Sequence, residues 1–171
     1  MTTQIQTSAP GKVATAAGKY LTFTLGLESY GIAVIKVREI IRPINITAVP
    51  QMPAYVKGVI NLRGKVIPIV DLRLRFELPE TKATERTCIV VVQIALGSGL
   101  QALMGLVVDG VEEVTNIAAT DIEPTPDFGA SLNIAYILGM AKIKGAVKTL
   151  LDIDKLLNAD AVTPILNNLP K

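Results

Sequence analysis

The sequence has no histidine, no tryptophan and a single cysteine, Cys88. Without histidine the chain cannot form a Ser-His-Asp triad, an imidazole metal site or an imidazole acid or base. One cysteine excludes an intramolecular disulfide. Because Cys88 opens the apolar run CIVVVQI, we expect a small buried side chain and not a nucleophile. An enzyme that works through carboxylates alone is the remaining catalytic alternative.

The sequence also lacks long hydrophobic runs, although half of its residues are hydrophobic. No apolar run approaches the roughly 18–20 residues that a membrane span needs. Residues 1–18 lack the apolar core of a signal peptide and are predicted to be a disordered leader. We therefore expect a cytoplasmic protein that does not insert directly into a membrane.

Charge and aromatic residues are too sparse to predict nucleic-acid binding. The net charge is +2, and aromatic residues make up 4% of the chain. Residues 1–80 carry ten Lys/Arg and five Asp/Glu, whereas residues 81–171 carry seven and ten. Neither half is strongly basic, and a base-stacking surface needs more aromatic side chains.

Two stretches resemble enzyme motifs but lack the spacing or residues that the corresponding chemistry requires. The stretch GVINLRGKV has five residues between its glycines, where a phosphate loop has four, and Val66 stands where Ser or Thr would hold magnesium. Glu112 and Glu113 are adjacent, so in a strand they point to opposite faces and cannot share a proton or a metal. We expect no cofactor and no metal.

The chain contains two copies of one small unit. AYVKGVINLRGKVIPIVDL, which begins at Ala54, aligns with AYILGMAKIKGAVKTLLDI, which begins at Ala135, at an offset of 81. Residues 30–40 align with residues 104–114 at an offset of 74. Because both blocks occur in the same order, we infer a duplication with units of about 19–80 and 87–157. A polar linker near residues 78–87 joins the two copies. Strands exchanged between the units fit the same pattern, and residues 158–171 form a C-terminal tail.

Each unit is predicted to fold as a small β-barrel. YLTFTLG alternates and is rich in strand-forming residues, and CIVVVQIALG is an apolar run of strand length. GVINLRG and KVIPIVDL meet at Arg63 and Gly64, which predicts a hairpin with glycine at its tight position. About five short strands per unit predict a mainly-β fold of two five-stranded barrels with a few short helices. Asp71 and Asp152 follow strands and are predicted to be helix N-caps.

Arg63 is the residue whose chemistry most suggests a binding role. The plain alternative is a solvated turn side chain. However, its neighbours are apolar, and the second copy keeps a cation at the matching position, Lys144. Arginine also offers a planar set of donors that suits the carboxylates of a partner. Glu39 is a similar charge beside aliphatic residues, and Glu113 is its counterpart.

Four motifs together closely resemble the CheW family of bacterial chemotaxis coupling proteins: SYG at 29–31, IKVREI at 35–40, YVKGVINLRGKVIPIVDLR and GLVVDGVEEV. The resemblance covers about residues 19–157. It implies two SH3-like barrels packed together and a non-enzymatic adaptor that couples transmembrane chemoreceptors to the histidine kinase CheA in arrays at the membrane. The implied partners are the receptor cytoplasmic tip, the CheA regulatory domain and further copies of the chain in rings. An adaptor of a surface-motility or developmental kinase pathway is the alternative.

The resemblance also implies a set of partner-binding positions. In the family pattern, the receptor tip binds in the groove between the barrels. The matching positions in this sequence are Val37, Glu39, Gly58, Asn61, Leu62, Arg63, Gly64 and Val108.

Overall fold

A computed structural model of the chain describes residues 16–95, 99, 101–124 and 136–157. Most of the predicted leader, and the whole of the predicted tail at 158–171, lie outside the described residues. The strands are β1 (Gly18–Leu25), β2 (Glu28–Ala33), β3 (Val37–Ile41), β4 (Val56–Leu62), β5 (Lys65–Asp71), β6 (Cys88–Ala95), β7 (Gln101–Val108), β8 (Gly110–Ile117), β9 (Ile122–Glu123), β10 (Ile137–Ile143) and β11 (Ala146–Leu151). The helical turns are η2 (Val34–Lys36), α2 (Leu72–Arg75), η3 (Ala119–Asp121) and α3 (Ile153–Leu157).

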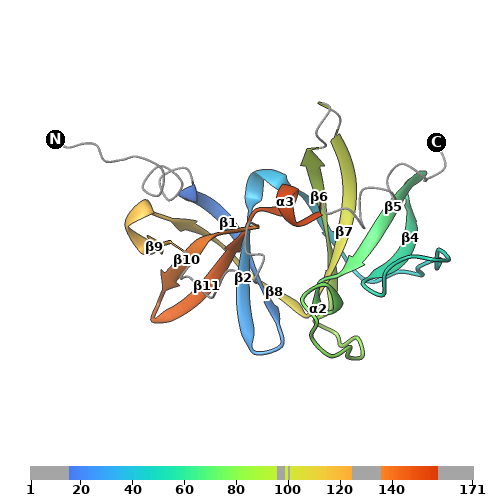
Figure 1. Cartoon of the computed structure of the whole chain (residues 1–171), viewed down its shortest axis with the longest axis horizontal. Coiled ribbons are helices and arrows are strands. Elements are labelled where there is room, and N and C mark those ends of the chain that lie inside the picture. The colour runs from blue at the N-terminus through green and yellow to red at the C-terminus, as the bar shows by residue number, and fades with distance from the viewer. Residues whose placement is uncertain (1–15, 96–98, 100, 125–135, 158–171) are drawn as a thin grey trace.

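The strands form two sheets that lie side by side (Figure 1). One sheet has the order β8-β1-β2-β11-β10-β9, and the other has the order β3-β6-β7-β5-β4. The prediction of a mainly-β fold of two small barrels with a few short helices is confirmed. The barrel that contains β1 carries a sixth, two-residue strand, β9, beyond the five expected.

Each sheet combines strands from both copies of the sequence repeat. The repeat matches β2 with β7, β3 with β8, and the β4–β5 hairpin with the β10–β11 hairpin. The first two strands of each copy therefore share a sheet with the remaining strands of the other copy. The parallel pairs β2–β11 and β5–β7 join the copies. The ranges 19–80 and 87–157 describe the repeat, whereas each sheet draws on both ranges.

The largest hydrophobic core lies between the two sheets and holds them together. It includes Phe23 and Ile32 from one sheet and Val90, Val92 and Leu106 from the other, all with no solvent exposure. Cys88 belongs to this core, as expected, and its burial raises the pKa of the thiol. A smaller core of Ile and Val side chains fills the barrel of β3–β7. This shared core fixes the position of one barrel against the other.

Both long hairpins close with the same two-residue turn. Arg63 and Gly64 have φ values of 50° and 88°, and Lys144 and Gly145 have φ values of 51° and 82°. Positive φ at both central residues is the pattern of a type I′ turn, which matches the twist of the flanking strands. The predicted glycine at the tight position is therefore observed in both copies.

The two predicted N-caps are also observed. The Asp71 carboxylate accepts a hydrogen bond from the backbone N–H of Arg73 at 2.9 Å, which starts α2. The Asp152 carboxylate accepts one from the N–H of Lys155 at 3.2 Å, which starts α3. These bonds satisfy N–H groups that the first turn of a helix leaves free.

Candidate functional site

Arg63 and Glu39 form an ion pair that closes one barrel. Glu39 lies on β3 and Arg63 lies in the turn after β4, and these are the two edge strands of their sheet. The Arg63 Nη2 atom contacts Glu39 Oε2. The Arg63 side chain is 70% exposed and that of Glu39 is 31% exposed, so both charges remain accessible to a partner. The structure thus brings together the two residues whose charges stood out in the sequence.

The second barrel repeats this ion pair. Lys144 Nζ lies 3.8 Å from Glu113 Oε1. Glu113 lies on the edge strand β8, and Lys144 follows β10, whose outer side is covered only by the short β9. Glu113 and Lys144 are the repeat counterparts of Glu39 and Arg63 at offsets of 74 and 81. The duplication therefore preserved a carboxylate and a cation at the same place in both barrels.

Exposed aliphatic residues lie close to both ion pairs in the sequence, although Ile40 and Val114 point to the opposite face of their strands from Glu39 and Glu113. Ile40 follows Glu39 and is 44% exposed, and Val66 lies three residues after Arg63 and is 37% exposed. Their counterparts in the second copy, Val114 and Val147, are each 58% exposed. None of these four residues was predicted to contact a partner, although their recurrence at the two offsets was a signal that could have found them. We call Glu39 and Arg63 the first ion-pair surface; Ile40 and Val66 are exposed aliphatic residues close to them in the sequence.

The remaining predicted residues on β3 and the β4–β5 hairpin have mixed roles. Val37 is half-buried against the main core, and Leu62 is half-buried against the smaller one. Asn61 is exposed, and its side-chain oxygen accepts a hydrogen bond from the N–H of Gly64 at 2.8 Å. That bond spans the turn and fixes the position of Arg63.

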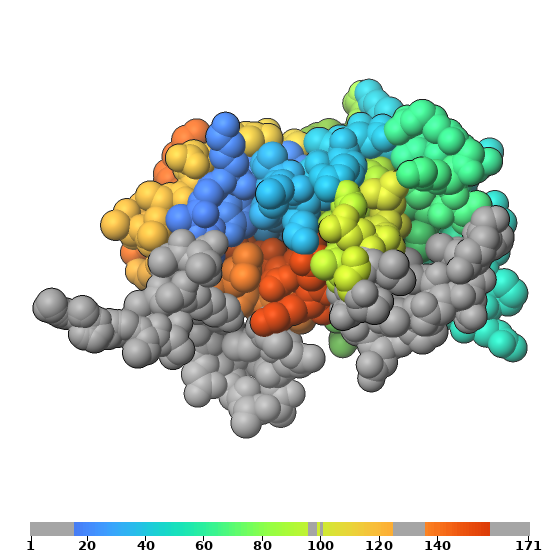
Figure 2. All heavy atoms as spheres, turned by 90° about the horizontal axis from the view of Figure 1, so that it is seen from above, coloured from blue at the N-terminus to red at the C-terminus, as the bar shows by residue number. Residues whose placement is uncertain are grey.

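From above, the light-blue segment of β2 and β3 lies between β1 and the green β4–β5 hairpin (Figure 2).

Gly58 is buried, and its conformation explains why the position is a glycine. Its φ is 138°, and a Cβ there would lie 2.0 Å from the carbonyl oxygen of Thr47. Thr47 pairs with Val59 through two backbone hydrogen bonds of 2.8 and 2.9 Å. Only glycine allows this close backbone approach. The structure therefore gives Gly58 a local folding role and no accessible surface for a partner.

Val108 lies in the main core and not on the surface. Its side chain is 1% exposed, and the residue pairs with Cys88 across β7 and β6. A partner cannot reach it in this conformation. The residue was placed from the family pattern alone, whereas its position on the central strand β7 turns the side chain inward. The large aliphatic residues of the second copy that are exposed in the described part of the chain are Val114 and Val147.

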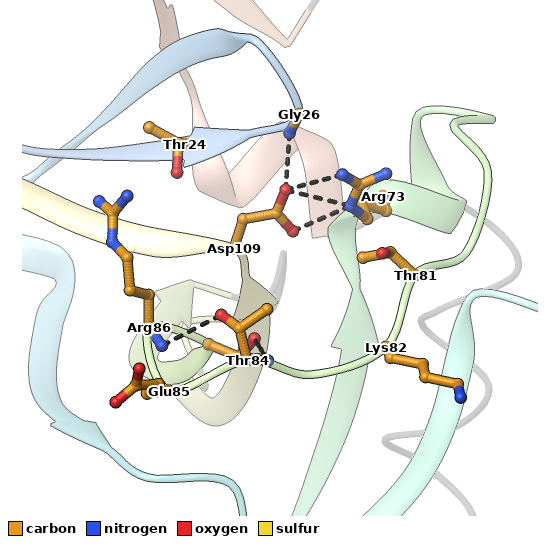
Figure 3. Close-up of a pocket in the computed structure, with 10 residues that line it drawn as sticks. Thr24, Gly26, Arg73, Thr81, Lys82, Thr84, Glu85, Arg86 and Asp109 are labelled. Atoms are coloured by element: carbon orange, nitrogen blue, oxygen red, sulfur yellow. Dashed lines mark hydrogen bonds and ion pairs between the residues drawn. The ribbon is translucent and has the colours of Figure 1, made fainter.

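A second polar cluster ties the two barrels together (Figure 3). The Asp109 carboxylate accepts hydrogen bonds from Arg73 Nε at 2.9 Å, from Arg73 Nη2 at 2.8 Å and from the N–H of Gly26 at 2.7 Å. Burial alone would raise the pKa of Asp109, but these bonds and the Arg73 charge outweigh it and hold the pKa below its usual value. The neighbouring open cavity has a volume of about 470 Å³. Because Asp109 and Arg73 satisfy each other, we interpret this cluster as a structural tie.

Within the described residues, the structure offers no group of three or more His, Cys, Asp or Glu side chains that could hold a metal ion. In the same part of the chain, no helix is long and apolar enough to cross a membrane.

Comparisons with known proteins agree on one family. The family model described as "CheW-like domain" matches residues 19–161. Chemotaxis protein CheW of Klebsiella aerogenes is 36% identical over 153 residues, which cover 90% of this chain and 89% of that protein. Chemotaxis protein CheW of Helicobacter pylori is 34% identical, with 83% and 82% covered. Protein FrzA of Myxococcus xanthus is 28% identical, with 81% and 84% covered.

A solved structure has the same fold. The crystal structure of scaffolding protein TtCheW from Thermoanaerobacter tengcongensis matches with a TM-score of 0.73 and 32% sequence identity. The match covers 85% of this chain and 95% of that one.

Proposed function

Because the chain belongs to the CheW family of chemotaxis coupling adaptors, we propose that it links the cytoplasmic tips of chemoreceptors to the histidine kinase CheA. Family membership makes the protein a chemotaxis coupling adaptor built as a scaffold. The identity of its partners and its recruitment to receptor arrays at the cytoplasmic face of the membrane are our proposals.

We propose that the receptor tip binds at the first ion-pair surface. The observation that carries this proposal is the recurrence of an accessible carboxylate–cation pair with exposed aliphatic neighbours in both barrels. A helical partner segment docks through apolar anchors, and charges at the rim fix its orientation. Arg63 is the strongest candidate contact, because its guanidinium can exchange Glu39 for a partner carboxylate without leaving the turn.

An adaptor of this kind acts by position and not by chemistry. We propose that the chain has no enzymatic activity. Such an adaptor can shift the equilibrium between two conformational states of the kinase only if it binds one state more tightly than the other. The size of the shift is limited by that difference in binding free energy.

Charge supports head-to-tail contacts with another two-barrel domain, either the CheA regulatory domain or a second copy of this chain. The part built from residues 34–95 and 101–109 carries ten Lys/Arg and six Asp/Glu. The part built from residues 16–33, 110–124 and 136–157 carries five and seven. Heterologous contacts between unlike barrels close into rings when the rotation permits.

Co-sedimentation with receptor-bearing membranes tests the coupling role. Wild type should pellet with the membranes and should increase the amount of CheA that pellets. Arg63→Ala should lose both effects. Lys57→Ala is the matched control, because Lys57 is a cation on β4, the strand that precedes the Arg63 turn, and it forms an ion pair with Glu80 at 2.7 Å. If wild type stays in the supernatant with both partners present, the proposed coupling is wrong for those receptors.

An adaptor of another kinase pathway is the second candidate, because one relative, Protein FrzA of Myxococcus xanthus, is not named for chemotaxis. It has weaker support, because the chain is 36% and 34% identical to relatives named for chemotaxis and 28% identical to FrzA. Deletion of the gene, followed by separate assays of swimming chemotaxis and of surface motility, distinguishes the two.

A further inference from the structure

The cavity beside the tie between Arg73 and Asp109 is walled by the linker that joins the two copies of the repeat (Figure 3). Most of the residues that line it come from linker residues 81–87, and the rest come from β1, the β1–β2 turn, α2 and the bend between β7 and β8. Its volume of about 470 Å³ falls within the roughly 300–1,000 Å³ of small-molecule sites. The linker therefore helps to build a recess that can hold a small ligand.

The linker presents Arg86 on a turn that threonine side chains hold in place. The N–H of Thr84 donates to Thr87 Oγ1 at 2.8 Å, and the N–H of Arg86 donates to Thr84 Oγ1 at 3.1 Å. The N–H of Thr87 donates to the carbonyl oxygen of Thr84 at 3.2 Å. Arg42, which follows β3, donates from Nη1 to the carbonyl oxygen of Glu85 at 2.8 Å. Because the turn is already fixed, little backbone ordering is needed when a ligand binds.

The hydrogen bonds of this turn leave two hydroxyl groups available as donors. The oxygens of Thr84 and Thr87 each accept a backbone N–H, so each hydroxyl hydrogen is left to donate. No bond donated by either hydroxyl is found among the described residues, and both side chains line the cavity. Two hydroxyl donors suit a group that only accepts hydrogen bonds, such as an oxyanion.

Arg86 adds a cation without a carboxylate partner in the described part of the chain. None of the ion pairs found there includes Arg86 or Lys82. The Arg86 guanidinium lies against Gly110, where a Cβ would come within 3.1 Å of its Nη2 atom. In Figure 3, Arg86 extends from the linker toward Thr24, whereas Lys82 extends away from Asp109. Arg86 is therefore the main unpaired cation of the cavity, and Lys82 lies at its rim.

Two carboxylates also line the cavity, but they do not cancel its positive charge. Asp109 is paired with Arg73 at 2.8 Å, so its charge is balanced within the tie. Glu85 is exposed, and in Figure 3 its carboxylate points away from Asp109 and toward solvent. With the cations of Arg73, Lys82 and Arg86, the lining keeps an excess of positive charge.

We propose that this cavity binds the phosphate group of a small phosphorylated metabolite. The planar donors of Arg86 contact two phosphate oxygens, and the hydroxyls of Thr84 and Thr87 donate to the others. The cavity is larger than one phosphate ion, so it has room for the group that carries the phosphate. No aromatic side chain lines it among the described residues, so a nucleobase would find no ring on which to stack.

This inference goes beyond the proposed adaptor function and does not depend on it. Only the folded chain brings the linker beside β1 and the tie, so a bound phosphate group should stabilise the folded state. The plain alternative is that Arg86 is a solvated surface arginine.

Titration calorimetry and thermal midpoints of the full chain test the proposal, with inorganic phosphate and pyrophosphate as the probes. Sodium chloride at matched ionic strength controls for general salt effects. Wild type should bind the probes, and its thermal midpoint should rise with their concentration. Arg86→Gln should weaken binding by roughly tenfold or more, because it removes charge-assisted hydrogen bonds. Lys82→Gln should weaken it less, because Lys82 lies at the rim.

Arg38→Gln is the matched control, because Arg38 is an exposed arginine of β3 outside the cavity and donates from Nε to Gln93 at 2.6 Å. Arg86→Lys keeps the charge but loses the planar donors, so its affinity should lie between those of wild type and Arg86→Gln. It also serves as the test if Arg86→Gln does not fold.

Two results would overturn the proposal. One is that phosphate and pyrophosphate give wild type no more heat and no higher midpoint than chloride does. The other is that Arg86→Gln and Arg38→Gln lose affinity equally, because binding would then reflect net charge alone. Neither readout uses a receptor or a kinase, so failure of this site is distinguishable from failure of the coupling role.

Discussion

At the residue scale, two turn glycines determine where the cations of the hairpin turns lie. Gly64 and Gly145 permit the tight turns that carry Arg63 and Lys144 outward; the sequence predicted the first turn, and the repeat relates the second to it. The contact between Arg63 and Glu39 could not be predicted in the same way. The two residues are 24 positions apart, and only closure of the barrel brings their strands together.

Substitution of Gly58 should damage the fold, whereas the same substitution at Gly64 should cost much less. A Cβ at residue 58 would collide with the Thr47 carbonyl, but a Cβ at residue 64 meets nothing within 4 Å. We expect Gly58→Ala to lower the free energy of unfolding by more than about 3 kcal/mol, through collision and positive φ together. Gly64→Ala should cost only about 1 kcal/mol of strain. Urea denaturation of both variants measures the difference, and equal losses would contradict the assigned role of Gly58.

Removal of Arg63 should leave the fold nearly intact. The pair with Glu39 is largely exposed, and exposed ion pairs contribute about 0–1 kcal/mol. Arg63→Ala should therefore lower the free energy of unfolding by less than about 1 kcal/mol, as measured by urea denaturation. A loss of several kcal/mol would mean that the pair is essential for closing the barrel, and any binding defect would then have a structural cause.

At the level of elements, local patterns predicted the hairpins and the helix caps, but not the sheet assignment. Asp71 and Asp152 cap their helical turns because strand-then-Asp is a local signal. The parallel pairings β2–β11 and β5–β7 join segments far apart in the chain. The alternation of apolar and polar residues along a strand does not determine which other strand it pairs with. The inward direction of Val108 depends on that same pairing.

The tie between α2, the β1–β2 turn and Asp109 should make stability depend on acid pH. The folded-state pKa of Asp109 is held below its unfolded value, so its contribution is complete above the unfolded pKa. The contribution is lost as the pH falls from that value through the lower folded pKa. In Asp109→Asn, this part of the dependence should be absent. Thermal midpoints from neutral pH to strongly acid pH measure it, and parallel curves for the two proteins would contradict the assignment.

On the scale of the whole molecule, the duplication gives two barrels that share a core but differ in charge. Composition predicted the uneven charge along the chain, and the structure shows that the exchanged strands leave the imbalance between barrels in place. The sequence could not show where charges without partners would lie. Lys82 and Arg86 became visible as cations of one cavity only in the folded chain.

Association with the kinase regulatory domain should slow as the salt concentration rises. Complementary charge between unlike barrels speeds encounter, and salt screens it over a Debye length of about 10 Å at 0.1 M. Stopped-flow association rates at increasing ionic strength measure this effect, with dissociation rates expected to change much less. A flat association rate would show that the charge difference between the barrels does not steer binding.

The proposed adaptor function depends above all on binding of the receptor tip at the first ion-pair surface. The most direct measurement is the dissociation constant of a receptor cytoplasmic fragment for wild type, Arg63→Ala and the matched control Lys57→Ala, with thermal midpoints recorded for all three. We expect Arg63→Ala to weaken binding by roughly tenfold or more, while Lys57→Ala stays close to wild type and all three proteins remain folded. Equal affinities for Arg63→Ala and Lys57→Ala would contradict it and move the receptor site to another part of the molecule.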